Sequence, residues 1–185
     1  MLAVTSTSIE AVKIITAKSF ADSRGVLCET YNRDRFFEHG ITLEFVQDTQ
    51  SLSIRSGTIR GLHFQSNPAA QAKLVRVING SIFGVAVDLR RSSPSYGKWI
   101  AEQLSAADGK QMLLPVGFAH GFCTLESDTS VFYKATACYS PAHDLGVAWD
   151  DPDLAIDWPV EPGKAILSER DKGLPRLSSL AGYFE

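Results

Sequence analysis

The sequence predicts a mainly β protein, a jelly roll whose two antiparallel sheets form a β-sandwich or flattened barrel. Apolar and polar residues alternate in many short runs that end at turn residues, as half-buried strands do. Runs with the 3.6-residue period of a helix are scarce. We therefore expect a few short helices only, and an irregular C-terminal tail.

The first half of the chain supplies several predicted strands and one helix. A turn with the sequence Asp-Ser-Arg-Gly separates the first two strands, and a short polar stretch before the third predicts a helix. In order, we expect strands at residues 12–20 and 26–31, a helix at residues 34–39, and strands at residues 44–54 and 58–64.

Asn79 and Gly80 give the strongest turn signal, because Asn-Gly supplies the positive φ angles of a type I′ turn. We therefore predict a β-hairpin of residues 73–78 and 81–89. Beyond about residue 141 the alternation weakens, and proline-containing turns predict a tail that crosses the surface. Between the hairpin and the tail, strands are expected at residues 98–104, 111–115, 121–125 and 130–137.

Length and composition indicate one soluble globular domain, residues 1–185. The chain is 44% hydrophobic and 21% charged, and no apolar run approaches the ~18 residues of a membrane span. The N-terminus lacks a basic start followed by an apolar run, so we expect no signal peptide and a cytoplasmic location.

The three cysteines are odd in number and widely spaced, which argues against a disulfide framework or a zinc knuckle. The net charge of −3 argues against nucleic acid as a partner, because proteins that bind phosphate backbones need clustered Lys and Arg. We expect reduced thiols and neither a nucleic-acid nor a membrane partner.

Residues 60–65 and 73–77 are the first candidates for a reaction site. They read Arg-Gly-Leu-His-Phe-Gln and Lys-Leu-Val-Arg-Val. Strand alternation places His63 on the opposite face from Arg60 and gives Lys73 to a second strand. If these strands are neighbours in a barrel, an imidazole and an ammonium both point inward, where burial shifts their pKa values.

Each candidate also fits a structural role when taken alone. Lys73 could be an ordinary strand lysine whose ammonium extends into water. The His120 ring could cap a turn by hydrogen bonding. Tyr133 and Tyr139 could be aromatic residues that only pack within or beside strands. Only the combination of residues favours a reaction site.

Many segments of the chain together resemble one enzyme family, the dTDP-4-dehydrorhamnose 3,5-epimerases. The order and spacing of the segments carry the resemblance, since any one tripeptide is weak. They are residues 24–25, 29–30, 45–48, 60–65, 87–90, 93–94, 115–122, 133–134, 139–141, 151–152, 158–159 and 168–171.

The resemblance implies a cupin-type jelly roll, usually a homodimer, that inverts C3 and C5 of a 4-keto-6-deoxyhexose attached to dTDP without a metal or other cofactor. It implies that His63 is the base, Asp171 its carboxylate partner and Lys73 the cation beside the C4 oxygen. Tyr133 is then the acid on the opposite side. A strand lent to the partner subunit is expected near residues 20–31.

The resemblance also implies a set of substrate-binding residues, among which Tyr139 stacks on thymine. Three of them depart from the family pattern, with Thr, Asp and Arg where Asn, Glu and Lys are common, which bears on binding more than on proton transfer. The set is Arg24, Glu29, Gln47, Thr49, Arg60, His120, Tyr139, Asp144 and Arg170, the departures being Thr49, Asp144 and Arg170.

These residue types suit proton transfer beside a ketone. A C–H next to a carbonyl is far less acidic than an imidazolium of pKa ~6.5, so a histidine base needs help. A lysine ammonium near the C4 oxygen stabilises the enolate as an oxyanion-hole donor does. Inversion also needs a proton from the opposite face, and a phenol of pKa ~10 can supply it.

Three alternatives stay open. The first is a C3-only or C5-only epimerase, or a keto-isomerase, acting on a related sugar nucleotide. The second is a metal-dependent cupin, which is disfavoured because Gln65 stands where a His-x-His ligand pair needs a second histidine. The third is a module that binds a sugar nucleotide without turning it over.

Overall fold

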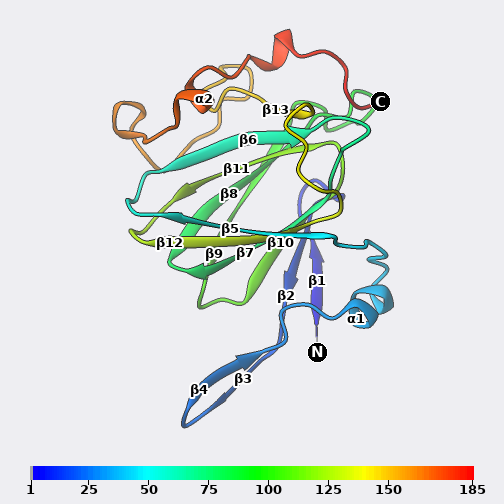
Figure 1. Ribbon diagram of the computed structural model, residues 1–185, viewed down its shortest axis with the longest axis vertical. Coiled ribbons are helices and arrows are strands. Elements are labelled where there is room, and N and C mark those ends of the chain that lie inside the picture. Colours follow the sequence, from blue (N-terminus) through cyan, green and yellow to red (C-terminus); the bar gives the residue numbers. More distant parts are fainter. Residues whose placement is uncertain (1) are drawn as a thin grey trace.

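The computed structural model describes residues 2–185 and contains two antiparallel sheets that face each other (Figure 1). The six-stranded sheet has the order β1-β2-β10-β7-β12-β5. Its strands are β1 Ala3–Ser6, β2 Lys13–Thr16, β5 Gln47–Ser53, β7 Lys73–Asn79, β10 Lys110–Leu114 and β12 Thr129–Ala135.

The five-stranded sheet has the order β13-β6-β11-β8-β9 and lies across the core from the first. β8 and β11 are buried along nearly their whole length, because the core covers one face of this sheet and the C-terminal segment covers the other. The strands are β6 Ile59–Gln65, β8 Ser81–Asp88, β9 Trp99–Ser105, β11 Phe118–Thr124 and β13 Asp144–Gly146.

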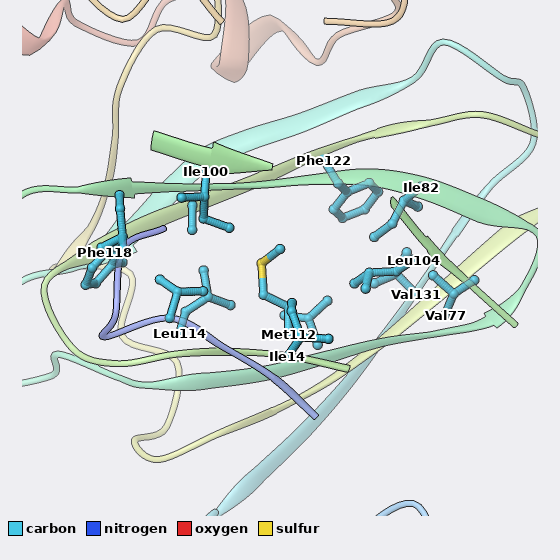
Figure 2. Close-up of a cluster of buried hydrophobic side chains, with 14 residues drawn as sticks. Ile14, Val77, Ile82, Ile100, Leu104, Met112, Leu114, Phe118, Phe122 and Val131 are labelled. Atoms are coloured by element: carbon cyan, nitrogen blue, oxygen red, sulfur yellow. The ribbon is translucent and has the colours of Figure 1, made fainter. Parts of the chain in front are cut away.

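The hydrophobic core fills the space between the two sheets (Figure 2). Val75, Val77 and Val131 contribute from the six-stranded sheet, and Ile82 and Phe122 from the other. This arrangement of two sheets with one shared core is the jelly roll that the alternating pattern predicts, so the fold-class prediction is confirmed.

The C-terminal segment packs on the outer face of the five-stranded sheet (Figure 1). Leu154, Trp158, Leu177 and Phe184 are buried there against side chains such as Val85. The segment is more ordered than the predicted tail, since it also supplies β13 and three short helices. These are η1 Pro162–Lys164, α2 Glu169–Lys172 and η2 Leu177–Ser179.

A separate two-stranded hairpin, β3 Ser19–Asp22 with β4 Gly25–Cys28, projects away from the two sheets (Figure 1). The one strand expected at residues 12–20 is therefore two strands in different sheets. Residues 17–18 are Ala and Lys, and no glycine or proline marks a turn there, so the local pattern could not show where the chain leaves the barrel. The helix α1 Arg33–Glu38 follows, close to its predicted place.

The predicted hairpin at Asn79 and Gly80 is wrong. Gly80 does have a positive φ of 77°, but β7 pairs with β10 and β12, whereas β8 pairs with β9 and β11. The turn therefore carries the chain from one sheet to the other. Both strands present apolar faces to the shared core, and packing those faces together requires opposite sheets.

The short edge strands β1 and β13 were not predicted, because runs of three or four residues give little alternation to detect. Most other strands lie within a few residues of their expected places. No helix within residues 2–185 has the length and apolar character needed to cross a membrane.

Candidate active site

A cavity of about 460 Å³ lies between the two sheets and is lined from both of them. The C-terminal segment closes one side of it. The lining residues are Ser51, Thr58, Ile59, Arg60, His63, Lys73, His120, Phe122, Tyr133, Ile166, Leu167, Ser168, Arg170 and Asp171. All four predicted catalytic residues are in this set, although they lie up to about a hundred positions apart in the sequence.

A bulge in β6 brings Arg60 and His63 to the same cavity. On β11, His120 pairs with His63 and Phe122 pairs with Arg60. The two β6 residues are three positions apart in the sequence, whereas their β11 partners are two positions apart. The extra residue shifts the alternation by one and turns both side chains to one face. The prediction that Arg60 and His63 face opposite ways is therefore wrong.

Gly61 makes this bulge feasible. Its φ is 112°, and a Cβ at this position would lie 2.6 Å from the carbonyl oxygen of His120. A side chain cannot occupy that space, so β6 and β11 approach closely only with glycine here.

His63 is held by Asp171. The Nε2 atom of the ring lies 2.6 Å from Oδ1 of the carboxylate, and the Asp171 side chain is only 5% exposed. Because an ionised carboxylate only accepts hydrogen bonds, Nε2 carries the hydrogen of the neutral ring and Nδ1 keeps a free lone pair. This tautomer leaves Nδ1 as the basic atom.

The helix α2 fixes the carboxylate. Ser168 is its N-cap, and its Oγ accepts a hydrogen bond from the Asp171 backbone N–H at 3.1 Å. The Gly61 N–H donates to the second carboxylate oxygen at 3.3 Å. Burial alone raises the pKa of Asp171, but its hydrogen bonds with His63, Gly61 and Ser168 bring that pKa below the usual value. The carboxylate is thus charged at neutral pH.

Lys73 extends from β7 into the cavity, where its Nζ lies 5.6 Å from the centre of the Tyr133 ring. Burial lowers the pKa of this lysine to about 8, while the charge of Asp144 opposes the decrease. The ammonium therefore stays mostly protonated at neutral pH, yet it is poorly hydrated. A poorly hydrated cation interacts strongly with any negative charge that develops beside it.

His120 lies directly opposite His63 on β11 and is 7% exposed. Burial, with the neighbouring charges of Lys73 and His63, lowers its pKa to about 3, so the ring is neutral. Its Nε2 atom is buried and has no hydrogen-bond partner among residues 2–185. A buried polar atom of this kind needs a partner, and the cavity that the ring lines is where one could bind.

Tyr133 lies on β12 in the sheet opposite His63. Burial raises the pKa of its phenol and Asp144 adds to the increase, whereas the neighbouring Thr49 hydroxyl and the charge of Arg60 oppose it. The phenol is therefore protonated at neutral pH. Arg60 itself is fixed by hydrogen bonds to Ser53 Oγ at 3.1 Å and to the Leu52 carbonyl at 3.0 Å.

The remaining predicted residues form a polar network around Tyr139. Its hydroxyl donates to Asp144 at 3.0 Å, and Asp144 pairs with Arg170 at 2.7 Å. The Tyr139 N–H donates to Gln47 Oε1 at 2.7 Å, and Gln47 Nε2 donates to Thr49 at 3.0 Å. Two of the residues that depart from the family pattern, Asp144 and Arg170, are thus partners in one ion pair. Asp is shorter than the usual Glu, and Arg is longer than the usual Lys.

Comparison with known proteins identifies the family of the chain. The sequence model of the dTDP-4-dehydrorhamnose 3,5-epimerase family matches residues 6–179. A curated enzyme of that name from Sinorhizobium fredii is 47% identical over 180 residues, which cover 97% of this chain and 92% of the relative. The chain belongs to the dTDP-4-dehydrorhamnose 3,5-epimerase family.

Two further relatives refine the comparison. The crystal structure of dTDP-6-deoxy-D-glucose-3,5-epimerase from Legionella pneumophila in complex with dTDP-4-keto-L-rhamnose matches with a TM-score of 0.93 at 39% identity, covering 98% of this chain and 95% of that one. A dTDP-4-dehydrorhamnose 3-epimerase from Streptomyces niveus is 42% identical over 165 residues, 89% of this chain and 78% of the relative. The protein is therefore an epimerase, an isomerase of this family.

Of the predicted binding residues, only Arg60, His120 and Arg170 line the cavity. Two others belong neither to its lining nor to the network around Tyr139. Arg24 lies at the tip of the projecting hairpin, where it pairs with Asp22 at 2.6 Å and is 89% exposed. Glu29 pairs with Arg35 at 3.0 Å. Within one chain, the structure does not gather the full set that the epimerase resemblance implies.

Ser168 and the Gly61 N–H were missed as parts of the site. The Gly61 N–H donates to the Asp171 carboxylate that holds His63, and the Ser168 hydroxyl accepts from the Asp171 backbone N–H. The Ser168-Glu169-Arg170-Asp171 sequence fits the S/T-x-x-D/E pattern of a helix N-terminus, so a capping signal for the serine was present. No group of three or more His, Cys, Asp or Glu side chains suited to a metal occurs within residues 2–185.

Proposed function

We propose that this protein inverts both C3 and C5 of dTDP-4-dehydro-6-deoxy-D-glucose to give dTDP-4-dehydro-L-rhamnose. The observation that carries the proposal is the placement of a base and an acid on opposite walls of one cavity. His63 comes from β6 of the five-stranded sheet and Tyr133 from β12 of the six-stranded sheet (Figure 1). Inversion at carbon needs proton removal and return on opposite faces.

In the proposed first step, Nδ1 of His63 removes the proton from the carbon beside the C4 ketone. The electron pair of the C–H bond moves to the C4 oxygen and forms an enolate. Asp171, 2.6 Å from the other ring nitrogen, stabilises the imidazolium. The Lys73 ammonium stabilises the enolate oxygen, a contribution of roughly 3–4 kcal/mol for one oxyanion donor.

In the second step, the Tyr133 phenol gives its proton to the opposite face of the same carbon. The inversion leaves an imidazolium and a phenolate, so both groups exchange protons with solvent before the next inversion. Solvent deuterium therefore enters each inverted carbon. The same cycle at the second carbon completes the double epimerisation.

Neutral His120 fits the binding part of this proposal. Its unpartnered Nε2 can hydrogen-bond a polar group of the sugar, and a neutral ring does not oppose the charge of Lys73. Arg60 lines the cavity, and its guanidinium can bind a phosphate group of the substrate. Tyr139 is 56% exposed, so its ring is accessible for stacking on the thymine.

A homodimer would complete the site. Phe20, Val26 and Leu27 are 55%, 68% and 75% exposed on the hairpin that carries Arg24, and exposed apolar residues of this kind mark a contact surface. In the dimer we propose, each hairpin covers the cavity of the other subunit and brings Arg24 and Glu29 to it.

Mixing two inactive variants tests the dimer. Arg24→Ala and His63→Asn homodimers should both be inactive, whereas a heterodimer contains one intact site. After subunit exchange, random mixing should restore about a quarter of the parent activity. A monomeric mass in solution, or no recovery after proven exchange, would contradict the shared site.

The main experiment follows deuterium uptake from D2O into dTDP-4-keto-6-deoxyglucose by NMR. We expect label at both C3 and C5, loss of exchange at both carbons in His63→Asn, and loss of inversion with residual exchange in Tyr133→Phe. A parent protein that binds the sugar nucleotide without exchange is a binding module, and the proposed function is then wrong.

The second candidate is a C3-only epimerase. The 42% identity to the Streptomyces niveus 3-epimerase favours it, because a relative this similar carries the narrower name. The same NMR experiment separates the two, since label at C3 alone supports the narrower reaction and comparable rates at both carbons rule it out.

A further inference from the structure

We propose that Thr49 is a positioning residue for the acid: its hydroxyl, oriented by Gln47, donates a hydrogen bond to the phenol oxygen of Tyr133 and stabilises the phenolate left after proton transfer. This inference rests on the proposed function, because Thr49 acts through the acid that the function requires. It assigns Thr49 to proton transfer rather than to substrate binding alone.

Strand register brings the two residues together. β5 pairs with β12 so that Thr49 lies directly opposite Tyr133. Along β5 the exposed side chains of Asp48 and Gln50 alternate with the half-buried side chains of Thr49 and Ser51. Ser51 lines the cavity, so Thr49 faces the same way, toward the interior side of the sheet.

The polarity of the hydrogen bonds follows from the Tyr139 backbone. Its N–H can only donate, so the group of Gln47 that faces it at 2.7 Å is the amide oxygen. The amide NH2 of Gln47 therefore faces Thr49 and donates to its hydroxyl oxygen at 3.0 Å. The single hydrogen of the Thr49 hydroxyl is left to donate elsewhere. In the proposal, its acceptor is the phenol oxygen of Tyr133, the residue directly opposite on the neighbouring strand.

The direction of this bond suits an acid. A hydrogen bond donated to the phenol oxygen is strengthened when that oxygen becomes charged, because bonds with an ionised acceptor are about twice as strong as neutral ones. Thr49 thus stabilises Tyr133 more after proton transfer than before it. An interaction of this kind accelerates the step instead of only tightening the ground state. In agreement, the contact with Thr49 lowers the pKa of Tyr133 against the effect of burial.

Titration of the Tyr133 phenol tests the proposal without any substrate. The chain has five tyrosines, and NMR of protein labelled at the tyrosine ring carbon bonded to oxygen resolves them, with Tyr133→Phe giving the assignment. In Thr49→Val, which keeps the shape but lacks the hydroxyl, the Tyr133 midpoint should move to higher pH. Thr49→Ser retains the hydroxyl and should titrate like the parent.

Gln47 provides a second test. In Gln47→Met the amide donor is lost, so the Thr49 hydroxyl loses its fixed orientation and the Tyr133 midpoint should again rise. The same change in a Thr49→Val background should add nothing, because Gln47 acts through the hydroxyl. Thr5→Val is the matched control, a threonine of β1 whose hydroxyl bonds the Ile14 carbonyl.

The kinetic consequence separates this role from simple stabilisation of the fold. Removal of the proton depends on His63, whereas inversion also depends on Tyr133. In Thr49→Val, inversion should therefore fall roughly tenfold while deuterium exchange at the same carbon changes about twofold or less. A fall of both rates by one factor would indicate a structural role and overturn the proposal.

An unchanged Tyr133 midpoint in Thr49→Val, or an equal change in Thr5→Val, would also overturn the proposal. These outcomes are independent of the proposed function. If the parent protein does not epimerise the sugar nucleotide, that function fails, yet the titration still decides whether Thr49 bonds Tyr133. If epimerisation is normal and the titration is unaffected, only the role of Thr49 is wrong.

Discussion

Replacing Asp171 with Asn tests the most constrained contact of the site. The change keeps the size of the side chain but removes its charge. The carboxylate now accepts from two donors, His63 Nε2 at 2.6 Å and the Gly61 N–H at 3.3 Å. An amide has only one oxygen, so it can accept from only one of these donors.

Both orientations of the amide are costly. If the oxygen faces His63, the NH2 group faces the Gly61 N–H, and the bond to the imidazolium loses its charge assistance, worth about 1.5–3 kcal/mol. If the NH2 group faces His63, Nε2 must become the acceptor and the hydrogen moves to Nδ1, which removes the base. The first case predicts a decrease in kcat of roughly 10–150-fold, and the wrong tautomer one of about 10⁴-fold.

Deuterium exchange and inversion should fall together in Asp171→Asn, because both begin with proton removal by His63 in the proposed mechanism. Asp34→Asn is the matched control, since that carboxylate is 83% exposed in its ion pair with Arg33. Thermal unfolding of both variants checks that the fold is intact. Exchange at the parent rate in a folded Asp171→Asn protein would refute the assigned role of the carboxylate.

Three other predictions concern charge and packing. Since burial lowers the pKa of Lys73 to about 8, kcat/KM should fall above about pH 8 as the ammonium loses its proton. Lys73→Met should abolish this decrease at high pH and lower kcat by roughly 10²–10³-fold. Burial raises the pKa of Asp88, yet hydrogen bonds from Arg90 and two serines outweigh it and lower that pKa to about 2. The stabilisation is therefore present above about pH 4 and lost toward pH 2, so urea unfolding should find Asp88→Asn less stable by about 2 kcal/mol at neutral pH, with a smaller difference in acid. Met112 is fully buried in the core (Figure 2), so Met112→Ala should lower the free energy of unfolding by about 2–5 kcal/mol. Ile54 is 72% exposed, so the control Ile54→Ala should change that free energy by about 0.5 kcal/mol or less.

Local sequence predicted the approximate place of most strands, because strand alternation is a property of neighbouring residues. It also determined that the chain contains the residue types for proton transfer beside a ketone. The family pattern then named His63, Lys73, Tyr133 and Asp171 as a set, and the structure gathers all four around one cavity.

Sheet membership could not be read from the sequence. Asn79 and Gly80 predict a hairpin, but the partner of a strand depends on which edges are already occupied, and β7 has β10 and β12 on its two sides. The β6 bulge was equally hidden, because it exists only relative to the residues of β11 that face it. These features decide that Arg60 and His63 share a cavity.

Asp171 shows most clearly what tertiary structure adds. In the sequence it belongs to a charged run typical of a solvated surface. In the fold its side chain is 5% exposed and hydrogen-bonded to His63, 108 positions away in the sequence. The sequence by itself predicted a jelly roll that contains a histidine, a tyrosine and a lysine suited to proton transfer. Only the packing of α2 against β6 decided which atom of His63 is basic, because a tautomer is fixed by the partner of the other ring nitrogen.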